Sequence, residues 1–231
     1  MSALAAEALR SMILSGELLP GERLPENSLT SQLGVSRSPL RQAMAVLQRE
    51  GLIVQEPRKG AIVAPLTAHD IYEIYTLREM LEELAVRLGV PVADETRLDR
   101  LRDAYAALET ATGEDQSEHT RLAFEFHLAL VGIAGHSRLE GTFRGISLQM
   151  QLCMAMNRRA RASIETIRED AIRHRPLLDL AVAGDAEGLL AALRDHGQRT
   201  FLLDAEEQLG GHSPESRAWF AEIRSTLDGQ G

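Results

Sequence analysis

Three histidines are the residues of this 231-residue chain whose placement points most directly to metal chemistry. His127, His174 and His196 each fall on the mostly apolar face of a different stretch with helical periodicity. A single histidine in such a place is usually a hydrogen-bonded core residue. Three that converge in one helical core can instead share a divalent ion such as Zn²⁺, because neutral imidazole is a good ligand and three of them leave one coordination position open.

A second group of residues has the chemistry of nucleic-acid binding. Arg37 and Arg41 lie four residues apart in SRSPLRQAM, so both side chains share one face near the start of a helix. Guanidinium groups at such an exposed leading end can bind guanine O6 and N7, or a phosphate, with two hydrogen bonds. Lys59, the only lysine of the chain, lies in the short turn sequence PRKG further along.

The distribution of charge supports this assignment. The net charge is −9, which by itself disfavours nucleic acid as a partner. Residues 1–66 nonetheless carry seven Arg or Lys and six Glu, a net charge of +1, which leaves −10 for residues 67–231. Phosphate binding needs local clustering of positive charge rather than a basic whole chain, so the first part remains the candidate for DNA contact.

The elements that must position these arginines are three helices and a hairpin. Apolar spacing and turn residues predict helices over 3–15, 26–33 and from Ser36 or Ser38 to Gly51, and β-rich runs over 52–56 and 61–66. Helices in this order, followed by a basic hairpin, predict a winged helix-turn-helix. In that fold one helix enters the DNA major groove and the hairpin lies beside it.

After Pro65 the pattern becomes entirely helical. The candidate helices cover 68–89, 95–112, 115–134, 137–160, 163–183 and 185–209, and the tail Ser213–Leu227 can add a short one. Glycine or proline falls at most of the breaks, and no strand signal or low-complexity tract occurs. The second part is therefore predicted to be an antiparallel bundle of about six helices.

The location of the protein is constrained by what the sequence lacks. No apolar run approaches the roughly 20 residues needed to cross a bilayer. The first residues carry Glu7 and Arg10 within a helical pattern and do not resemble a secretory signal. The single cysteine, Cys153, excludes an intrachain disulfide and fits a reducing compartment. We therefore expect a cytoplasmic protein with no membrane partner.

The N-terminal part resembles the GntR family of bacterial transcription regulators. VSRSPLRQAMAVLQREGLI follows the family pattern V-S-R-[ST]-P-[VL]-R-x-A-L-x-x-L-x-x-x-G-[LW], and the likeness extends from Leu4 to Pro65. Position 27 is asparagine where the fatty-acid-responsive members carry an arginine, so their operator preference is not expected. The resemblance implies that the DNA-contacting residues are Ser36, Arg37, Ser38 and Arg41 at bases or phosphates, Arg49 at the backbone, and Gly60 with Lys59 at the minor groove.

The helical part resembles the FCD domain, the ligand-binding half of the FadR subfamily. The stretches that carry this likeness are LREMLEELAVRL (77–88), FEFHLALVGIAGHSRL (124–139) and IRHRPLLDLAVAGDAEGLLAALRDH (172–196). The metal-binding branch of these domains uses three histidines, matched here by His127, His174 and His196, and an aspartate four residues before the first, where this chain has Ala123. The resemblance implies a divalent metal, Zn²⁺ first and Ni²⁺ or Mn²⁺ as alternatives, with a carboxylate effector supplying the missing anionic oxygen. Alternatively, the histidines hydrogen-bond an organic ligand directly.

Further effector contacts are expected on the first helix of this part. Its core stripe is predicted to be Leu77, Leu81, Leu84 and Leu88. Arg78 borders this stripe and is expected either to pair with Glu82 or to bind an anionic effector. Asn157 is a weaker effector candidate, and Glu125 is expected to point away from His127. The other histidines, near helix ends or in loops, are expected at the surface: His69, His119, His136 and His212.

These observations predict a mainly α protein with a winged helix-turn-helix at 1–66, an FCD-like antiparallel helical bundle for effector binding and dimerisation at 67–210, and a tail at 211–231. The expected function is that of a ligand-responsive transcription regulator and not of an enzyme. It would bind a palindromic operator on double-stranded DNA as a homodimer, under control of a small organic acid.

Two alternatives remain at this point. The three histidines could form the zinc site of a metal-dependent hydrolase, although the sequence places no general base or nucleophile motif near them. The helical part could also be a dimerisation module without a ligand.

Overall fold

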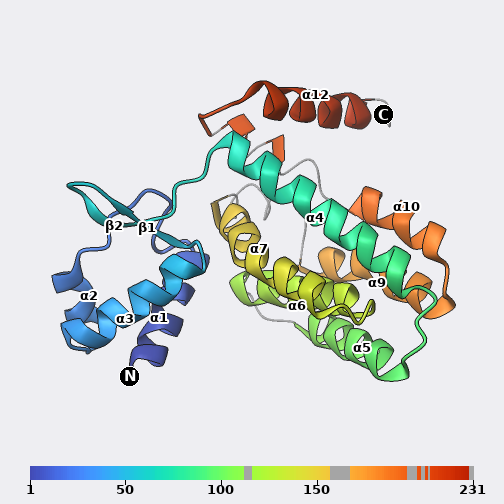
Figure 1. Cartoon of the computed structure of the whole chain (residues 1–231), viewed down its shortest axis with the longest axis horizontal. Helices are drawn as coiled ribbons and strands as arrows, with labels where there is room; N and C mark the ends of the chain where they lie inside the picture. The colour runs from blue at the N-terminus through green and yellow to red at the C-terminus, as the bar shows by residue number, and fades with distance from the viewer. Residues whose placement is uncertain (112–115, 157–166, 197–201, 204–205, 208, 229–231) are drawn as a thin grey trace.

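The computed structural model describes the chain except for residues 112–115, 157–166, 197–201, 204–205, 208 and 229–231. Figure 1 shows a small N-terminal unit of three helices and a hairpin beside a larger helical unit. An extended segment joins the two and leads into a long helix. The chain is mainly α-helical, and one two-stranded sheet occurs among the described residues, as the sequence predicted.

The N-terminal unit contains α1 (Ser2–Leu14), α2 (Glu26–Leu33) and α3 (Arg37–Arg49). Helix α1 packs along α3, and their apolar faces meet around Leu9, Leu40 and Leu47, which have no exposed surface. Helix α2 ends at Gly34, whose φ of 64° lies in the left-handed region that glycine adopts without steric cost. This glycine lets the chain turn within three residues and start α3 at a steep angle to α2.

The hairpin follows directly after α3. Strand β1 (Ile53–Glu56) pairs antiparallel with β2 (Gly60–Val63), so that Ile53 lies opposite Val63 and Glu56 opposite Gly60. Ile53 and Val63 are buried against the helices, which fixes the register because a shift by one residue would expose both. The tip of this wing therefore carries residues 57–59.

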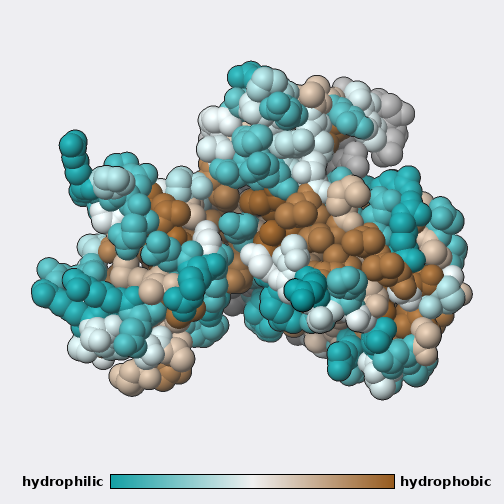
Figure 2. Space-filling model, in the orientation of Figure 1, coloured by the Kyte–Doolittle hydropathy of each residue, from teal (hydrophilic) through white to brown (hydrophobic). Residues whose placement is uncertain are grey.

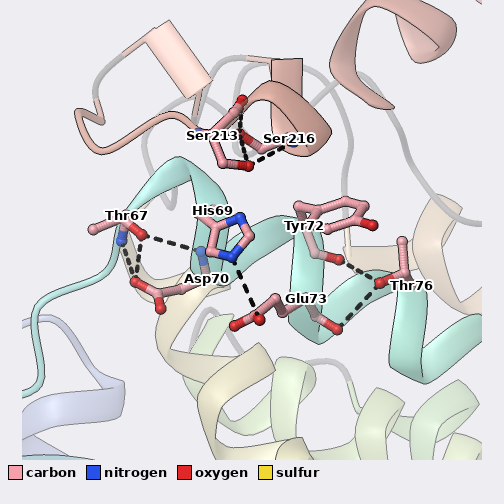
Figure 3. Close-up of polar contacts among 8 residues, drawn as sticks. All are labelled: Thr67, His69, Asp70, Tyr72, Glu73, Thr76, Ser213 and Ser216. Carbon is pink, nitrogen blue, oxygen red and sulfur yellow. Dashed lines mark hydrogen bonds and ion pairs between the residues drawn. The ribbon is translucent and has the colours of Figure 1, made fainter. Parts of the chain in front are cut away.

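The larger unit is a bundle of packed helices. They are α4 (Ala68–Gly89), α5 (Glu95–Thr110), α6 (Gln116–Gly132), α7 (Ser137–Met156), α9 (Ile167–Ala183) and α10 (Ala186–His196). Thr67 caps α4 by accepting from the Asp70 amide, and the Asp70 carboxylate accepts from the Thr67 amide in return. Figure 3 shows this reciprocal capping box at the start of α4.

Most helix limits agree with the sequence prediction to within three residues. The predicted helix over 137–160 ends at Met156 in the described part of the chain, and 157–160 lies outside it. The predicted start of the 163–183 helix also lies outside the described residues. Only part of the predicted 185–209 helix is described: α10 to His196, and residues 202–203 and 206–207, which are also helical.

The prediction for the buried face of α4 was wrong for three of its four leucines, whereas Leu81 is partly buried against the bundle core. Leu77, Leu84 and Leu88 are 41%, 44% and 55% exposed, whereas Arg78 and Glu82 are 7% and 5% exposed. Helix α4 packs on α6, α7 and α10 through the neighbouring face, which also carries small residues such as Ala85 and Gly89. A close helix approach explains this choice: a Cβ at position 89 would lie 2.7 Å from the Ala134 amide nitrogen.

The C-terminal tail forms α12 (Pro214–Asp228) and packs on α4. Phe220 and Ile223 are buried in the bundle core, and the Trp219 ring contacts Tyr72 of α4 edge to face. Ser213 caps the helix by accepting from the Ser216 amide (Figure 3). The tail thus adds a helix, as the sequence predicted, and this helix is part of the bundle core.

Helix α7 connects the two units. Phe143, Met150 and Cys153 belong to the bundle core, whereas Leu152 lies in the core of the N-terminal unit with no exposed surface. The burial of Cys153 confirms that it packs in a helix and raises the pKa of its thiol to about 12. No helix of the described residues is long and apolar enough to span a membrane.

Candidate functional site

The leading end of α3 forms an exposed polar surface. Ser36, Arg37, Ser38 and Arg41 are all exposed there, on the side of α3 away from its buried Leu40–Leu47 stripe. Ser36 is at the N-cap position, but its hydroxyl makes no capping hydrogen bond. These hydroxyl and guanidinium groups are therefore available to a partner.

Two side chains of α2 hold these arginines in place. Arg41 Nε donates to both carboxylate oxygens of Glu26 at 3.0 and 3.1 Å, and Arg37 Nη2 donates to Asn27 Oδ1 at 3.1 Å. The hydrogen bond to Glu26, followed by its negative charge, raises the pKa of Arg41 above its usual value. Both arginine side chains therefore lie against α2, on the same side of the helix-turn-helix.

The other predicted DNA contacts lie apart from this end. Lys59 at the wing tip pairs with Glu56, with Nζ 2.6 Å from Oε2, and Gly60 follows it with a φ of 82°. Arg49 is in the last turn of α3, twelve residues after Arg37, which is roughly 18 Å along a helix at 1.5 Å per residue. The structure therefore does not bring Arg49 to the leading end of α3.

The three histidines named from sequence meet in one place. His127 of α6, His174 of α9 and His196 of α10 converge, and Nε2 of His196 is 3.2 Å from the Nε2 atoms of both other rings. Ligands of a tetrahedral zinc site at about 2.0–2.1 Å from the ion lie about 3.3 Å from one another. The separations in this protein match that requirement. Among the described residues, these three rings form a cluster of potential metal ligands whose donor atoms all lie within 4.8 Å of one another.

Hydrogen bonds define which nitrogen carries the proton in two of the three rings, His127 and His174. His174 Nδ1 is 2.7 Å from the Asp170 carbonyl oxygen, which can only accept, so Nδ1 donates and Nε2 keeps its lone pair. His127 Nδ1 is 2.9 Å from Glu82 Oε1, a carboxylate oxygen that has the same effect. Such partners orient metal-binding histidines in many proteins.

Burial keeps the three histidines neutral. Loss of hydration lowers the pKa of His127, His174 and His196 below 6.5, and it is the largest cause for each. The positive charge of Arg78 lowers the pKa of His127 further, and His174 does the same for His196. Neutral rings with free Nε2 lone pairs are the form that binds a metal ion, so the donor set fits a divalent cation.

A buried arginine and glutamate of α4 complete the cluster. Arg78 Nε donates to Glu82 Oε1 at 3.1 Å, while Arg78 Nη2 lies 2.9 Å from His127 Nε2. The pairing with Glu82, one of the two alternatives expected for Arg78, is therefore present, and the other, binding of an anionic effector, stays a prediction. Glu82 was not predicted as a site residue. The sequence feature that could have identified it is its position four residues after Arg78, on the helix face that also carries Ala85.

Position 123 holds alanine, and the carboxylate at the cluster is supplied by α4 instead. Glu82 contacts His127 through Nδ1 and not through the free Nε2. It therefore orients the ring rather than replacing the aspartate of the family as a ligand. Glu125 is exposed and faces a different cavity, which agrees with the expectation that it points away. Asn157 lies outside the described residues.

The expectation that His119 lies at the surface was wrong. His119 is 4% exposed, and its Nε2 is 2.7 Å from Asp170 Oδ2. It occurs eight residues before His127, so both rings project from the inner face of α6, with Ala123 between them. His69 and His212 are partly buried near the start of α12, and His136 is exposed.

Comparisons with known proteins place both units in established families. The family described as bacterial regulatory proteins, gntR family, matches residues 2–63, and the FCD domain matches residues 73–199. The HTH-type transcriptional regulator YdhC of Bacillus subtilis (strain 168) is 37% identical over 161 residues, which are 69% of this chain and 72% of that protein.

Two further relatives agree with this assignment. The gluconate operon transcriptional repressor of Bacillus licheniformis is 32% identical over 154 residues, which are 66% of this chain and 63% of that protein. The crystal structure of a GntR transcriptional regulator from Rhodococcus sp. RHA1 is similar with a TM-score of 0.69 at 27% identity, covering 90% of this chain and 96% of that one. The chain belongs to the GntR family, as a DNA-binding transcription regulator, not an enzyme, in which a winged helix-turn-helix is followed by an FCD domain.

Proposed function

We propose that this regulator acts in the cytoplasm as a homodimer on a palindromic operator, and that a small organic acid at the histidine cluster sets its operator affinity. The observation that carries the proposal is the triangle of Nε2 atoms of His127, His174 and His196 beside the Arg78 guanidinium. Three neutral nitrogens and one cation form a site for a metal ion and an anion together.

A divalent ion would be held by the three Nε2 atoms. Zn²⁺ suits three imidazoles with one open position, and Ni²⁺ or Mn²⁺ are the alternatives. When bound, the ion supplies positive charge and a coordination position for a ligand oxygen. Because Ala123 provides no carboxylate, the protein would not neutralise the positive charge of the ion, which could then attract an anionic ligand.

Arg78 gives the same ligand a second contact. In the present arrangement Arg78 Nη2 approaches the lone pair of His127 that a metal would use. Metal and guanidinium cannot share that lone pair, so metal binding turns Arg78 away from Nε2. A carboxylate bound beside Arg78 would offset the positive charge that a metal held by the three histidines would add. Since a relative is named as a gluconate operon repressor, sugar acids are the first effectors to test.

The exposed apolar face of α4 supports a homodimer. Leu77, Met80, Leu84 and Leu88 are 41–61% exposed, and Figure 2 shows a broad hydrophobic area where α4 crosses the molecule. Soluble monomers rarely leave large continuous apolar patches uncovered. Two copies that pair this face would present two copies of α3, which matches a two-fold symmetric operator.

The metal-binding part of the proposal predicts that the purified protein binds about one Zn²⁺ per chain and that His174→Ala abolishes this binding. One fewer nitrogen leaves two protein ligands, too few for a stable site. Elemental analysis and titration with a coloured zinc chelator measure the stoichiometry and affinity.

His69→Gln serves as a control, because His69 lies at the start of α4 outside the cluster, and it is expected to bind zinc like the wild type. Equal zinc binding by His174→Ala and the wild type would contradict the metal site. Operator binding that does not respond to metal or to any carboxylate in a fluorescence anisotropy titration would contradict the effector site.

A further inference from the structure

A second cavity lies between the two units, away from the histidine cluster. It has a volume of about 470 Å³ and is formed by α1 and the end of α3 on one side and by α6 and α7 on the other. Figure 1 shows these helices facing one another across the junction of the two units. Cavities of roughly 300–1,000 Å³ are typical of small-molecule sites, which often occur between domains.

A mostly buried amide side chain lines this cavity. Gln151 of α7 belongs to the lining and is only 8% exposed. One turn earlier, Ser147 is 9% exposed, and its hydroxyl donates to the Arg144 carbonyl, which leaves the oxygen able to accept. The amide and the hydroxyl are polar groups to which a ligand in the cavity could form hydrogen bonds.

The charged residues around the cavity carry both signs and are mostly paired. Arg10 pairs with Glu50 and Arg121 with Glu118, each with a shortest N–O distance of 2.7 Å. Glu125, also at the cavity, is exposed on α6. A simple anion would meet several carboxylates and a simple cation several guanidiniums. A small zwitterion can place its ammonium near Glu125 and its carboxylate near an arginine.

The floor of the cavity is apolar. Phe124 and Leu128 of α6 are buried there, and Leu14 and Leu148 contribute from α1 and α7. A ligand therefore needs a short carbon skeleton as well as polar groups. We propose that this cavity is a second binding site, specific for a free amino acid, whose polar groups contact Gln151 and Ser147 and whose two charges meet the mixed rim.

Such a ligand would contact both units at once. Its rim contacts come from α1 and α3 on one side and from α6 on the other, so its binding favours one arrangement of the winged helix-turn-helix on the bundle. Phe124 also lies under the Arg78 guanidinium, whose carbon is 5.9 Å from the ring centroid. A single aromatic ring thus separates the amino-acid cavity from the histidine cluster.

The test uses the full-length protein and isothermal titration with each of the twenty common amino acids, beside propionate, propylamine and glycerol. Saturable binding of at least one amino acid is expected, at least tenfold tighter than binding of the three comparison compounds. Gln151→Leu should weaken it at least tenfold, and Glu125→Gln should weaken it as well. Gln149→Leu, two residues away and outside the cavity lining, should bind like the wild type.

Because leucine is close to glutamine in size, the leucine variant is expected to fold, and its melting temperature without ligand should stay close to that of the wild type. His174→Ala should still bind the amino acid, which separates this site from the histidine cluster. Failure of all twenty amino acids to bind, binding that survives Gln151→Leu, or equal binding of propionate would overturn the proposal.

Discussion

The charge of His127 depends on what surrounds its ring. Desolvation and the nearby Arg78 guanidinium both oppose protonation, while Glu82 holds Nδ1–H and leaves Nε2 free. Burial likewise lowers the pKa of His174, and the hydrogen bond from its Nδ1 to the Asp170 carbonyl oxygen leaves the proton off Nε2. These residues therefore need no protein carboxylate at position 123 to be competent ligands, although an added anion would strengthen the site.

At the leading end of α3, Arg37→Ala is expected to weaken operator binding by about 1–3 kcal/mol, the range found for a lost base contact. Arg41→Ala should act similarly and reduce the salt dependence if it contacts phosphate. Fluorescence anisotropy at several salt concentrations provides the measurement. Arg138→Ala is a suitable control, since Arg138 is exposed on the bundle at the start of α7. An unchanged affinity of Arg37→Ala would show that this end of α3 does not face DNA.

Two adjacent glutamates of α4 offer a comparison of buried and exposed ion pairs. Glu82→Gln leaves Arg78 buried beside a neutral partner, and breaking a buried pair costs about 3–5 kcal/mol of unfolding free energy. Glu83→Gln removes only the exposed pair with Arg87, which contributes below about 1 kcal/mol. Urea denaturation measures both. Similar losses for the two variants would contradict the buried position of Glu82.

Helix α4 has two apolar faces with different partners. One face, with Ile71, Tyr75 and Ala85, is covered by the bundle, and the other, with Leu77, Met80 and Leu84, is exposed in a single chain. The exposed face is the reason for expecting a second copy. Helix α12 covers only the beginning of α4, through Phe220 and Trp219, and leaves this face open.

Leu84→Glu is expected to convert the dimer to a monomer, because the substitution would bury a charge in the apolar contact between the two copies of α4. Light scattering after size-exclusion chromatography reports the mass directly. Ile172→Glu, at another exposed apolar residue on α9, should leave the mass unchanged. A wild type that runs as a monomer at all concentrations would refute the proposed dimer face.

The whole molecule is held together at the junction by α7. Leu152 is fully buried in the core of the N-terminal unit, and Gly51 at the end of α3 lies so close to α7 that a Cβ would meet the Gln149 side chain. The arrangement of the DNA-binding unit on the bundle therefore depends on one helix that also contributes to the bundle core. A shift of α7 would move the DNA-binding unit with it.

Leu152→Ala is expected to lower the unfolding free energy by about 2–5 kcal/mol, the usual cost of such a cavity, and to loosen the N-terminal unit from the bundle. Limited proteolysis should then cut the connection at residues 64–67 faster than in the wild type. Leu139→Ala truncates a buried residue of the same helix within the bundle core, and should destabilise the protein without this faster cleavage. Equal cleavage rates for the two variants would argue against α7 as the connection.

Local sequence patterns determined the helices and strands of this protein and the inward position of its three histidines. The spacing of apolar residues sets helix limits, and glycines such as Gly34 set the turns, because both effects act within a few residues. The same spacing places His127, His174 and His196 on core faces before any tertiary contact is known. The same local spacing places Arg37 and Arg41 on one exposed face at the start of α3.

Only the tertiary structure decided which of two possible faces of α4 is buried. Both faces have helical spacing, and the leucine-rich one looked like the core face by composition. Packing placed Arg78 and Glu82 inside instead, because small residues such as Ala85 and Gly89 permit a closer approach of α6. The burial of His119 and the cavity at Gln151 likewise depend on segments far apart in sequence, whose contacts no local pattern specifies.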